Sequence, residues 1–117
     1  MYKSFTEMPV WKKTHKLAVK AFKLTTNLPR LGVYGLTSQI RRSASSVAGN
    51  IADGFGRKTK KDKAHFYIIA RGSLFETQNH LLYGNKVSYF SDENTTMLLN
   101  QYSDLIYELN KLIISLT

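Results

Sequence analysis

The sequence predicts an all-α protein, an up-down-up-down antiparallel four-helix bundle that takes up residues 1–117 as one domain. Three observations predict this fold. Apolar residues recur at three-, four- and seven-residue steps in four separate segments, which is the period of an amphipathic helix. Strand signals are weak, because no Asn-Gly or Asp-Gly turn separates two alternating runs. The chain also has the length of one ordinary domain, so its core needs no disulfide or metal.

The first expected helix covers roughly residues 10–28 and lies between the only two prolines of the chain, Pro9 and Pro29. Its apolar face comprises Val10, Leu17, Ala21, Leu24 and Leu28. Pro9 suits the first turn of a helix, whereas Pro29 disfavours helical geometry in the residue before it. We therefore expect residues 30–35 to form a loop.

The second expected helix covers roughly residues 36–55. Its apolar face comprises Leu36, Ile40, Ala44, Val47, Ile51 and Phe55. Gly54 and Gly56 supply the backbone freedom with which helices commonly end. The third expected helix covers roughly residues 60–89, and Thr59 followed by Asp62 forms a capping box at its start.

The fourth expected helix covers roughly residues 92–116 and follows Ser91. Asp92 and Glu93 stand in its first turn, where acidic residues complement the helix dipole. Its apolar face has the most regular heptad spacing of the chain: Leu98, Tyr102, Leu105, Leu109, Leu112 and Leu116.

Two of these helices carry more apolar or small residues than one core needs. The third contains Phe66-Tyr67-Ile68-Ile69, Leu74-Phe75 and Leu81-Leu82-Tyr83, and consecutive apolar residues point around a helix. The second contains small residues that let another backbone approach: Ser43, Ala44, Ser45, Ser46, Ala48, Gly49 and Ala52. We hypothesise that these surfaces form a homo-oligomer interface. The alternative is that one bundle packs its own interior tightly.

Positive charge lies almost entirely in the first half of the chain. Residues 1–63 hold 14 Lys and Arg against 3 Asp and Glu, residues 64–117 hold 3 against 5, and the net charge is +9. Such asymmetry favours a polyanionic partner for one face, and RNA or DNA is the first candidate. The alternative is that the charge serves solubility alone.

Four lysines of the first helix, Lys12, Lys16, Lys20 and Lys23, lie within about 80° of one another around the helix axis. We call them the lysine stripe, which is about 16 Å long and lies opposite the apolar face. No acidic residue of the same helix interrupts it. The stripe is either a nucleic-acid-binding surface or an ordinary solvated face.

Five cations stand between the second and third helices, and we call them the turn cluster: Arg57, Lys58, Lys60, Lys61 and Lys63. Lys60 and Lys61 fall in the first turn of the third helix, where a positive charge opposes the helix dipole by about 0.3–1 kcal/mol. Unpaired amides together with five cations predict a phosphate-binding site. The alternative is a mobile turn that only aids solubility.

A third set of charged residues is expected to be structural. Arg41 and Arg42 lie in a helix that is otherwise apolar or small, and Asp53 stands at the favourable i, i+4 spacing from Arg57. Arginine suits ion pairs at interfaces. We expect pairs between helices or subunits within the set Arg41, Arg42, Asp53, Arg71 and Glu76.

The sequence contains no recognisable catalytic or cofactor motif. His15, His65 and His80 lack the HExxH spacing and the chain has no cysteine, so we expect no metal site. Carboxylates are few and scattered, so we expect no enzymatic activity and no cofactor. Five tyrosines have the rings that stack on bases, although core packing is their commoner use: Tyr67, Tyr83, Tyr89, Tyr102 and Tyr107.

The sequence also predicts the subcellular localisation of the protein. No segment approaches the roughly 20 apolar residues of a membrane span, and the first residues lack the apolar run of a signal peptide. The absence of cysteine agrees with a reducing compartment. We expect a cytoplasmic protein with no membrane partner.

Three motifs resemble a known family. Residues 34–44, YGLTSQIRRSA, resemble the YGLTSQIRRAA signature of the four-helix bundle proteins encoded in 23S rRNA intervening sequences. Residues 50–57, NIADGFGR, are similar to that family's NIAEGFGR, and residues 70–76, ARGSLFE, to its ARGSLxE. The chain differs in having Asp53 for the usual Glu and Ser43 for the usual Ala. The shorter acid at Asp53 changes the reach of one expected ion pair.

The resemblance implies an up-down bundle that can assemble into a homopentamer. The same fold group includes the accessory variability determinant protein of diversity-generating retroelements, a basic pentamer that binds nucleic acid and a reverse transcriptase. The family pattern offers no catalytic residues. Resemblance and charge together predict an oligomeric module that binds RNA or DNA through the lysine stripe and the turn cluster. The alternative is a protein-interaction scaffold or accessory subunit, for example of a reverse transcriptase.

Overall fold

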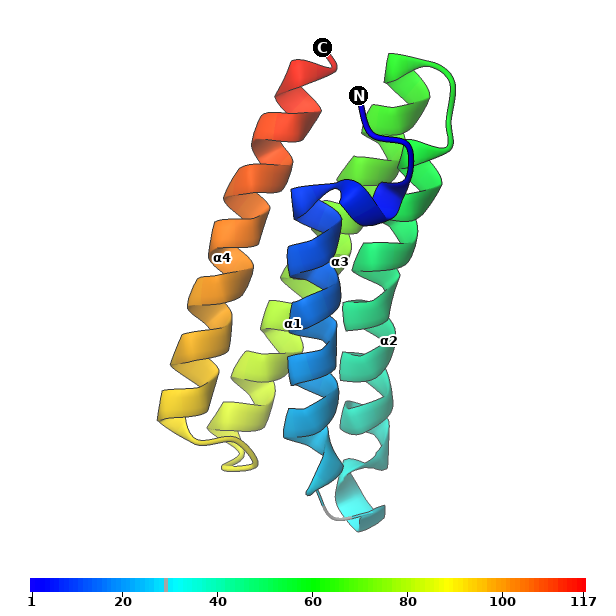
Figure 1. Ribbon diagram of the computed structural model, residues 1–117. Coiled ribbons are helices and arrows are strands. Elements are labelled where there is room, and N and C mark those ends of the chain that lie inside the picture. Colours follow the sequence, from blue (N-terminus) through cyan, green and yellow to red (C-terminus); the bar gives the residue numbers. More distant parts are fainter. Residues whose placement is uncertain (29) are drawn as a thin grey trace.

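The computed structural model describes residues 1–28 and 30–117, and for residues 30–34 it describes the backbone alone. A short 3-10 helix, η1 (Phe5–Glu7), precedes four long helices: α1 (Pro9–Thr26), α2 (Arg30–Phe55), α3 (Lys60–Lys86) and α4 (Asp92–Ser115). Successive long helices run in opposite directions and form an elongated bundle of 45 × 22 × 20 Å (Figure 1). The described residues contain no strand, so the predicted all-α fold is confirmed.

The helix starts follow the predicted capping chemistry. Pro9 occupies the first turn of α1. The hydroxyl of Thr59 accepts a hydrogen bond from the Asp62 amide at 3.0 Å, and the hydroxyl of Ser91 accepts one from the Asn94 amide at 3.1 Å. Both side chains satisfy an amide that the helix itself leaves unpaired.

Two predicted boundaries differ from the structure by three residues or more, whereas α1 ends at Thr26, two residues before the predicted Leu28. The loop expected over residues 30–35 is wrong, because α2 already begins at Arg30. A single glycine costs a helix only about 1 kcal/mol, so Gly32 and Gly35 do not stop it. Pro29, which the prediction used to end the first helix, lies outside the described residues.

The other difference is at the end of α3, which stops at Lys86, three residues before the predicted Tyr89. Ser88 has a φ of 69°, and the amide of Tyr89 donates to the carbonyl of Gly84 at 2.8 Å. This is a Schellman turn with serine in the left-handed position that glycine usually takes. The turn sends the Phe90 ring against Gly84, where a side chain would collide with it.

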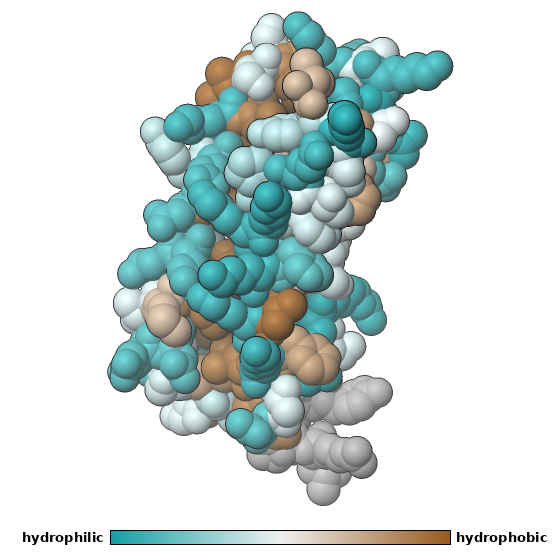
Figure 2. All heavy atoms as spheres, in the orientation of Figure 1, coloured by the Kyte–Doolittle hydropathy of each residue, from teal (hydrophilic) through white to brown (hydrophobic). Residues whose placement is uncertain are grey.

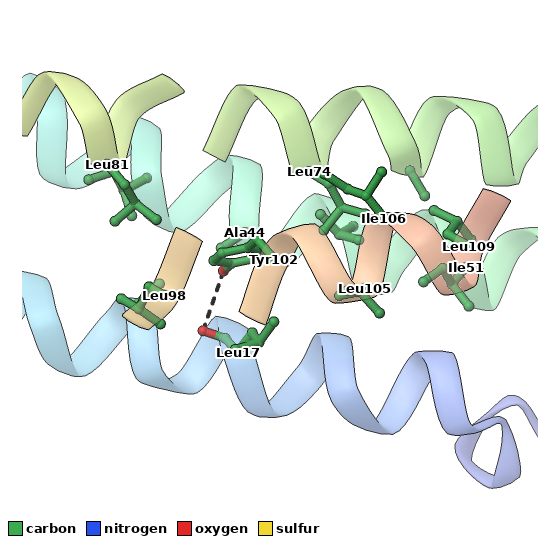
Figure 3. Packing of buried hydrophobic residues seen from close by; sticks show 14 of the residues in the cluster. Leu17, Ala44, Ile51, Leu74, Leu81, Leu98, Tyr102, Leu105, Ile106 and Leu109 are labelled. Carbon is green, nitrogen blue, oxygen red and sulfur yellow. Dashed lines mark hydrogen bonds between the residues drawn. The ribbon is translucent and has the colours of Figure 1, made fainter. Parts of the chain in front are cut away.

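The core is formed by the apolar faces that the sequence predicts. Ile40, Val47, Ile51, Leu105 and Leu109 are almost completely buried. Side chains from all four helices meet along the bundle axis, and the Tyr102 hydroxyl points at the carbonyl of Leu17 (Figure 3). Among the described residues, none of the helices has the length and apolar character needed to cross a bilayer.

Helices α2 and α3 form the most extensive pair, and small residues let them approach closely. The hydroxyl of Thr77 donates to that of Ser43 at 2.8 Å in the buried interface, and Ser73 donates to Ser46 at 3.2 Å. At Gly54, an added Cβ would lie 2.6 Å from Cε1 of Tyr67. Part of the small-residue surface of α2 therefore packs within one chain.

Candidate nucleic-acid interface

The lysine stripe faces acidic residues that belong to α4. Lys12, Lys16 and Lys23 are exposed, whereas Lys20 is half-buried and its Nζ donates to Oε1 of Gln101 at 3.4 Å. Between α1 and α4 runs a groove of about 230 Å³, with Lys16 and Lys20 on one wall.

The opposite wall of this groove carries Asp104 and Glu108. Glu108 forms an ion pair with Lys13, the lysine next to the stripe. Hydrophilic side chains cover the middle of this side of the molecule (Figure 2). The acids of α4 therefore offset part of the positive charge of the lysine stripe.

The turn cluster divides into two groups. Lys63 is half-buried, and its Nζ donates to the carbonyl oxygens of Phe55 at 2.7 Å and of Gly54 at 3.4 Å. These are terminal carbonyls of α2, so Lys63 caps that helix. Arg57 lies 3.7 Å from the carboxylate of Asp53, and its guanidinium stacks 4.3 Å from the centre of the Phe66 ring.

The second group consists of Lys58, Lys60 and Lys61. All three side chains are exposed, and none forms an ion pair with another residue in the described part of the chain. Lys60 and Lys61 stand in the first turn of α3, as the sequence predicts. This is the part of the turn cluster that is available to an external phosphate.

Within one chain, two of the arginines expected to form structural ion pairs bind neutral groups. Nε of Arg41 donates to the hydroxyl of Thr25 at 2.9 Å, and its guanidinium stacks 3.9 Å from the centre of the Phe22 ring. Nη1 of Arg71 donates to Oδ1 of Asn110 at 2.9 Å. Both arginines thus join neighbouring helices.

The remaining members of that set lie at the surface. Arg42 is exposed on α2. Asp53 pairs with Arg57 at the predicted i, i+4 spacing, and Oε2 of Glu76 lies 3.5 Å from Nε2 of His80 in the next turn of α3. The contacts of Arg41 and Arg71 involve residues of other helices. The spacing of residues along one helix does not predict such partners.

The histidines are separate from one another. The His15 ring stacks on Trp11 with 4.8 Å between ring centres. His65 is exposed, and His80 is largely covered beside Glu76. No group of three or more His, Asp or Glu side chains gathers as a metal-ligand set among the residues that the structure describes.

The five tyrosines divide by burial. Tyr67 and Tyr102 are buried in the core, so they are not available for stacking on bases, and burial raises the pKa of both hydroxyls. Tyr83, Tyr89 and Tyr107 are 58%, 38% and 65% exposed. Tyr83 and Tyr89 line one pocket, together with Gln39 and Asn79, which the sequence did not single out.

Comparison with known proteins agrees with the fold. The family model described as 23S rRNA-intervening sequence protein matches residues 6–111. A crystal structure of a protein with unknown function from the S23 ribosomal protein family of Bacteroides thetaiotaomicron VPI-5482 superimposes with a TM-score of 0.80 and 23% identity, covering 89% of this chain and 97% of that one. At this identity, the likeness shows the fold alone. No curated protein matches the chain.

Proposed function

The chain belongs to the 23S rRNA-intervening sequence protein family, and from this premise we propose that it is a non-enzymatic module that binds RNA or DNA through phosphate contacts. The observation that carries the proposal is the second group of the turn cluster. Lys58, Lys60 and Lys61 extend into solvent from one end of the bundle.

The position of these lysines favours a functional role over a stabilising one. Two of them stand in the first turn of α3, where acidic residues would stabilise the helix and cations oppose its dipole. A phosphate at this position gains both from the cations and from the partial positive charge of the helix start. Binding is therefore expected to depend on charge and only weakly on sequence.

The test is the double substitution Lys60→Glu and Lys61→Glu. Fluorescence anisotropy should show weaker binding to single- and double-stranded RNA and DNA alike, with a shallower dependence on salt between about 50 and 200 mM, because fewer phosphates are neutralised. The charge-preserving pair Lys60→Arg and Lys61→Arg should retain the wild-type affinity. An affinity that does not change with salt in the wild-type protein would contradict the proposal.

We further propose that the module is a homo-oligomer, with a pentamer implied by the family resemblance. An exposed stripe on α3 supports this: Ile68, Phe75 and Leu82 are 44%, 54% and 52% exposed and recur at seven-residue spacing. Gly72 lies on the same face, and an added Cβ would meet nothing within 4 Å. A ring would repeat the turn cluster and raise the avidity for long nucleic acids. A monomeric mass in light scattering at micromolar concentration would contradict this part of the proposal.

The groove between α1 and α2 favours a second candidate function, a protein-interaction scaffold. It has a volume of about 470 Å³ and mostly apolar walls that include Val19, Phe22 and Ala48. Apolar side chains also reach the surface in the lower half of the face shown in Figure 2. Lys23 and Arg41 line the same groove, which suits an acidic amphipathic helix. A protein partner that stays bound after nuclease treatment, and is released by Phe22→Asp, would favour this candidate.

A further inference from the structure

A pocket of about 490 Å³ lies between the first turns of α2 and the last turns of α3, at the end of the bundle away from the turn cluster. Its walls come from three stretches of the chain: Gly35, Leu36 and Gln39; Asn79, His80 and Tyr83; Val87 and Tyr89. Gln39 and Asn79 are exposed, and their side-chain amides form no hydrogen bond within the described residues. The pocket therefore offers two amides that can each donate and accept.

Two aromatic rings stand beside these amides. Tyr83 and Tyr89 keep 58% and 38% of their surface exposed. Their hydroxyls likewise make no hydrogen bond to any described residue. The pocket surface thus combines two partly exposed rings with amides whose hydrogen bonds a ligand can take over from solvent.

The backbone that places Tyr89 at the pocket is the Schellman turn that ends α3. Ser88 has a φ of 69°, a left-handed conformation that disfavours any residue with a Cβ. The amide of Tyr89 is then fixed by its hydrogen bond to the carbonyl of Gly84 at 2.8 Å. The turn thereby sets the position of one pocket wall.

His80 forms part of the floor. Its Nε2 is buried without a hydrogen bond, and the nearest acidic oxygen is Oε2 of Glu76 at 3.5 Å. The imidazole thus contributes a flat and mostly covered surface. The lining as a whole combines flat rings with amides that can form hydrogen bonds to the polar edge of a planar ligand.

We propose that this pocket holds a nucleobase. A base is planar, so it can stack on a tyrosine ring, and its edge carries the donors and acceptors that Gln and Asn recognise. Arg42 stands one helical turn beyond Gln39, and Lys86 one turn beyond Tyr83, and both side chains are exposed. In this proposal they contact the phosphates on either side of the base. The inference rests on the proposed nucleic-acid binding and adds a base contact to its phosphate contacts.

The test compares two strands of equal length and charge, an oligoadenylate and a strand of abasic sugar-phosphate units. The wild-type protein should bind the strand with bases about tenfold more tightly, because stacking on an aromatic ring is a contact that the abasic strand lacks. Tyr83→Leu combined with Asn79→Ala should reduce the affinity for oligoadenylate to that for the abasic strand. Tyr107→Leu is the control, because this tyrosine is 65% exposed, compared with 58% for Tyr83, but lies on α4, and it should leave the preference unchanged.

The outcomes separate this inference from the proposed function. Equal binding of both strands by the wild-type protein would overturn the base pocket and leave the phosphate contacts standing. Binding of neither strand at about 50 mM salt would overturn both. An equal loss of preference in Tyr107→Leu would also overturn the assignment to this pocket.

A competition with free AMP identifies the source of the base. In one outcome, AMP displaces oligoadenylate from the wild-type protein and leaves the weaker binding of the Tyr83→Leu, Asn79→Ala variant unchanged. That result would show that the pocket also binds free nucleotides. Failure of AMP to compete, with the preference for bases intact, would show that the phosphates of a strand are needed to hold the base in place. Both results support a nucleobase as the occupant.

Discussion

The α2–α3 and α1–α4 interfaces are built in opposite ways. Between α2 and α3, glycine and hydroxyl side chains bring the backbones close, as Gly54 under Tyr67 and the Ser43–Thr77 hydrogen bond show. Between α1 and α4, the contact is the least extensive of the four adjacent long-helix pairs, and a groove with lysines on one wall and acids on the other runs along it. One interface therefore depends on packing, whereas the other combines packing with charge.

The largest effect is expected at Gly54, where Gly54→Ala tests the close packing. The new Cβ would lie 2.6 Å from Cε1 of Tyr67 and 3.2 Å from Cβ of Phe66, so side chains or backbones must shift. Overpacking of this kind lowers the free energy of unfolding by about 1–3 kcal/mol. Urea denaturation measures the loss.

Gly49→Ala is the matched control for that experiment. It lies in the same helix with nothing within 4 Å of an added Cβ, so it should stabilise the chain by about 0.5–1 kcal/mol. Equal effects of the two substitutions would show that the distance between α2 and α3 is not critical. A loss of stability in Gly49→Ala would indicate that another molecule packs on this face.

Each interface also contains a buried tyrosine whose pKa is raised by burial, more strongly for Tyr102 than for Tyr67. A free tyrosine ionises near pH 10, so above that pH the unfolded chain loses a proton that the folded chain retains. Below about pH 10 the free energy of unfolding does not depend on the ionisation of these tyrosines. Above that pH it falls by up to about 1.4 kcal/mol per pH unit for each buried tyrosine.

Thermal unfolding between about pH 9 and 11 tests this sign. Tyr102→Phe should lose less stability over that range than the wild-type protein. At neutral pH it should cost at most about 1 kcal/mol, because its hydroxyl makes one hydrogen bond, of 3.4 Å, to the carbonyl of Leu17. Tyr107→Phe should follow the wild-type curve, since this side chain is exposed. A steeper loss of stability at high pH in Tyr102→Phe than in the wild-type protein would show that the buried Tyr102 hydroxyl does not cause the loss.

The smallest effect is expected from the charges of the α1–α4 groove. Asp104→Asn removes a negative charge beside the lysine stripe and should tighten nucleic-acid binding by a factor of about two to five at low salt. Glu93→Gln, in the first turn of the same helix, is the control and should change the affinity less. No difference between the two variants would show that nucleic acid does not bind along the α1–α4 side.

The sequence predicts the helices well because the residues that a helix buries recur at three- and four-residue steps along the chain. The apolar faces, the caps at Thr59 and Ser91 and the fold class follow from spacing and from local chemistry. The start of α2 at Arg30 differs from the prediction because proline disfavours helical geometry only in the residue before it, and neither Gly32 nor Gly35 is sufficient to end a helix.

The candidate sites were harder to predict because they depend on contacts between helices. The stripe contains no acid of its own helix, yet Asp104 lies across the groove on α4, more than 80 residues later in the chain. Lys63 belongs to a cationic run, but its reach to the carbonyl of Phe55 becomes evident only in the folded turn. The pocket brings Gln39 beside Asn79 and Tyr89 because α2 and α3 are antiparallel.

The two ends of the chain and the α2–α3 turn lie at the same end of the bundle (Figure 1). A domain fused to either terminus would therefore stand next to Lys58, Lys60 and Lys61, whereas the tyrosine pocket would remain remote along a body 45 Å long. A nucleic acid bound to these lysines as proposed would then reach such a fused domain from one fixed side. A bulky tag at either terminus would occupy that same side, so a linker between Thr117 and a C-terminal tag should restore binding that this tag suppresses.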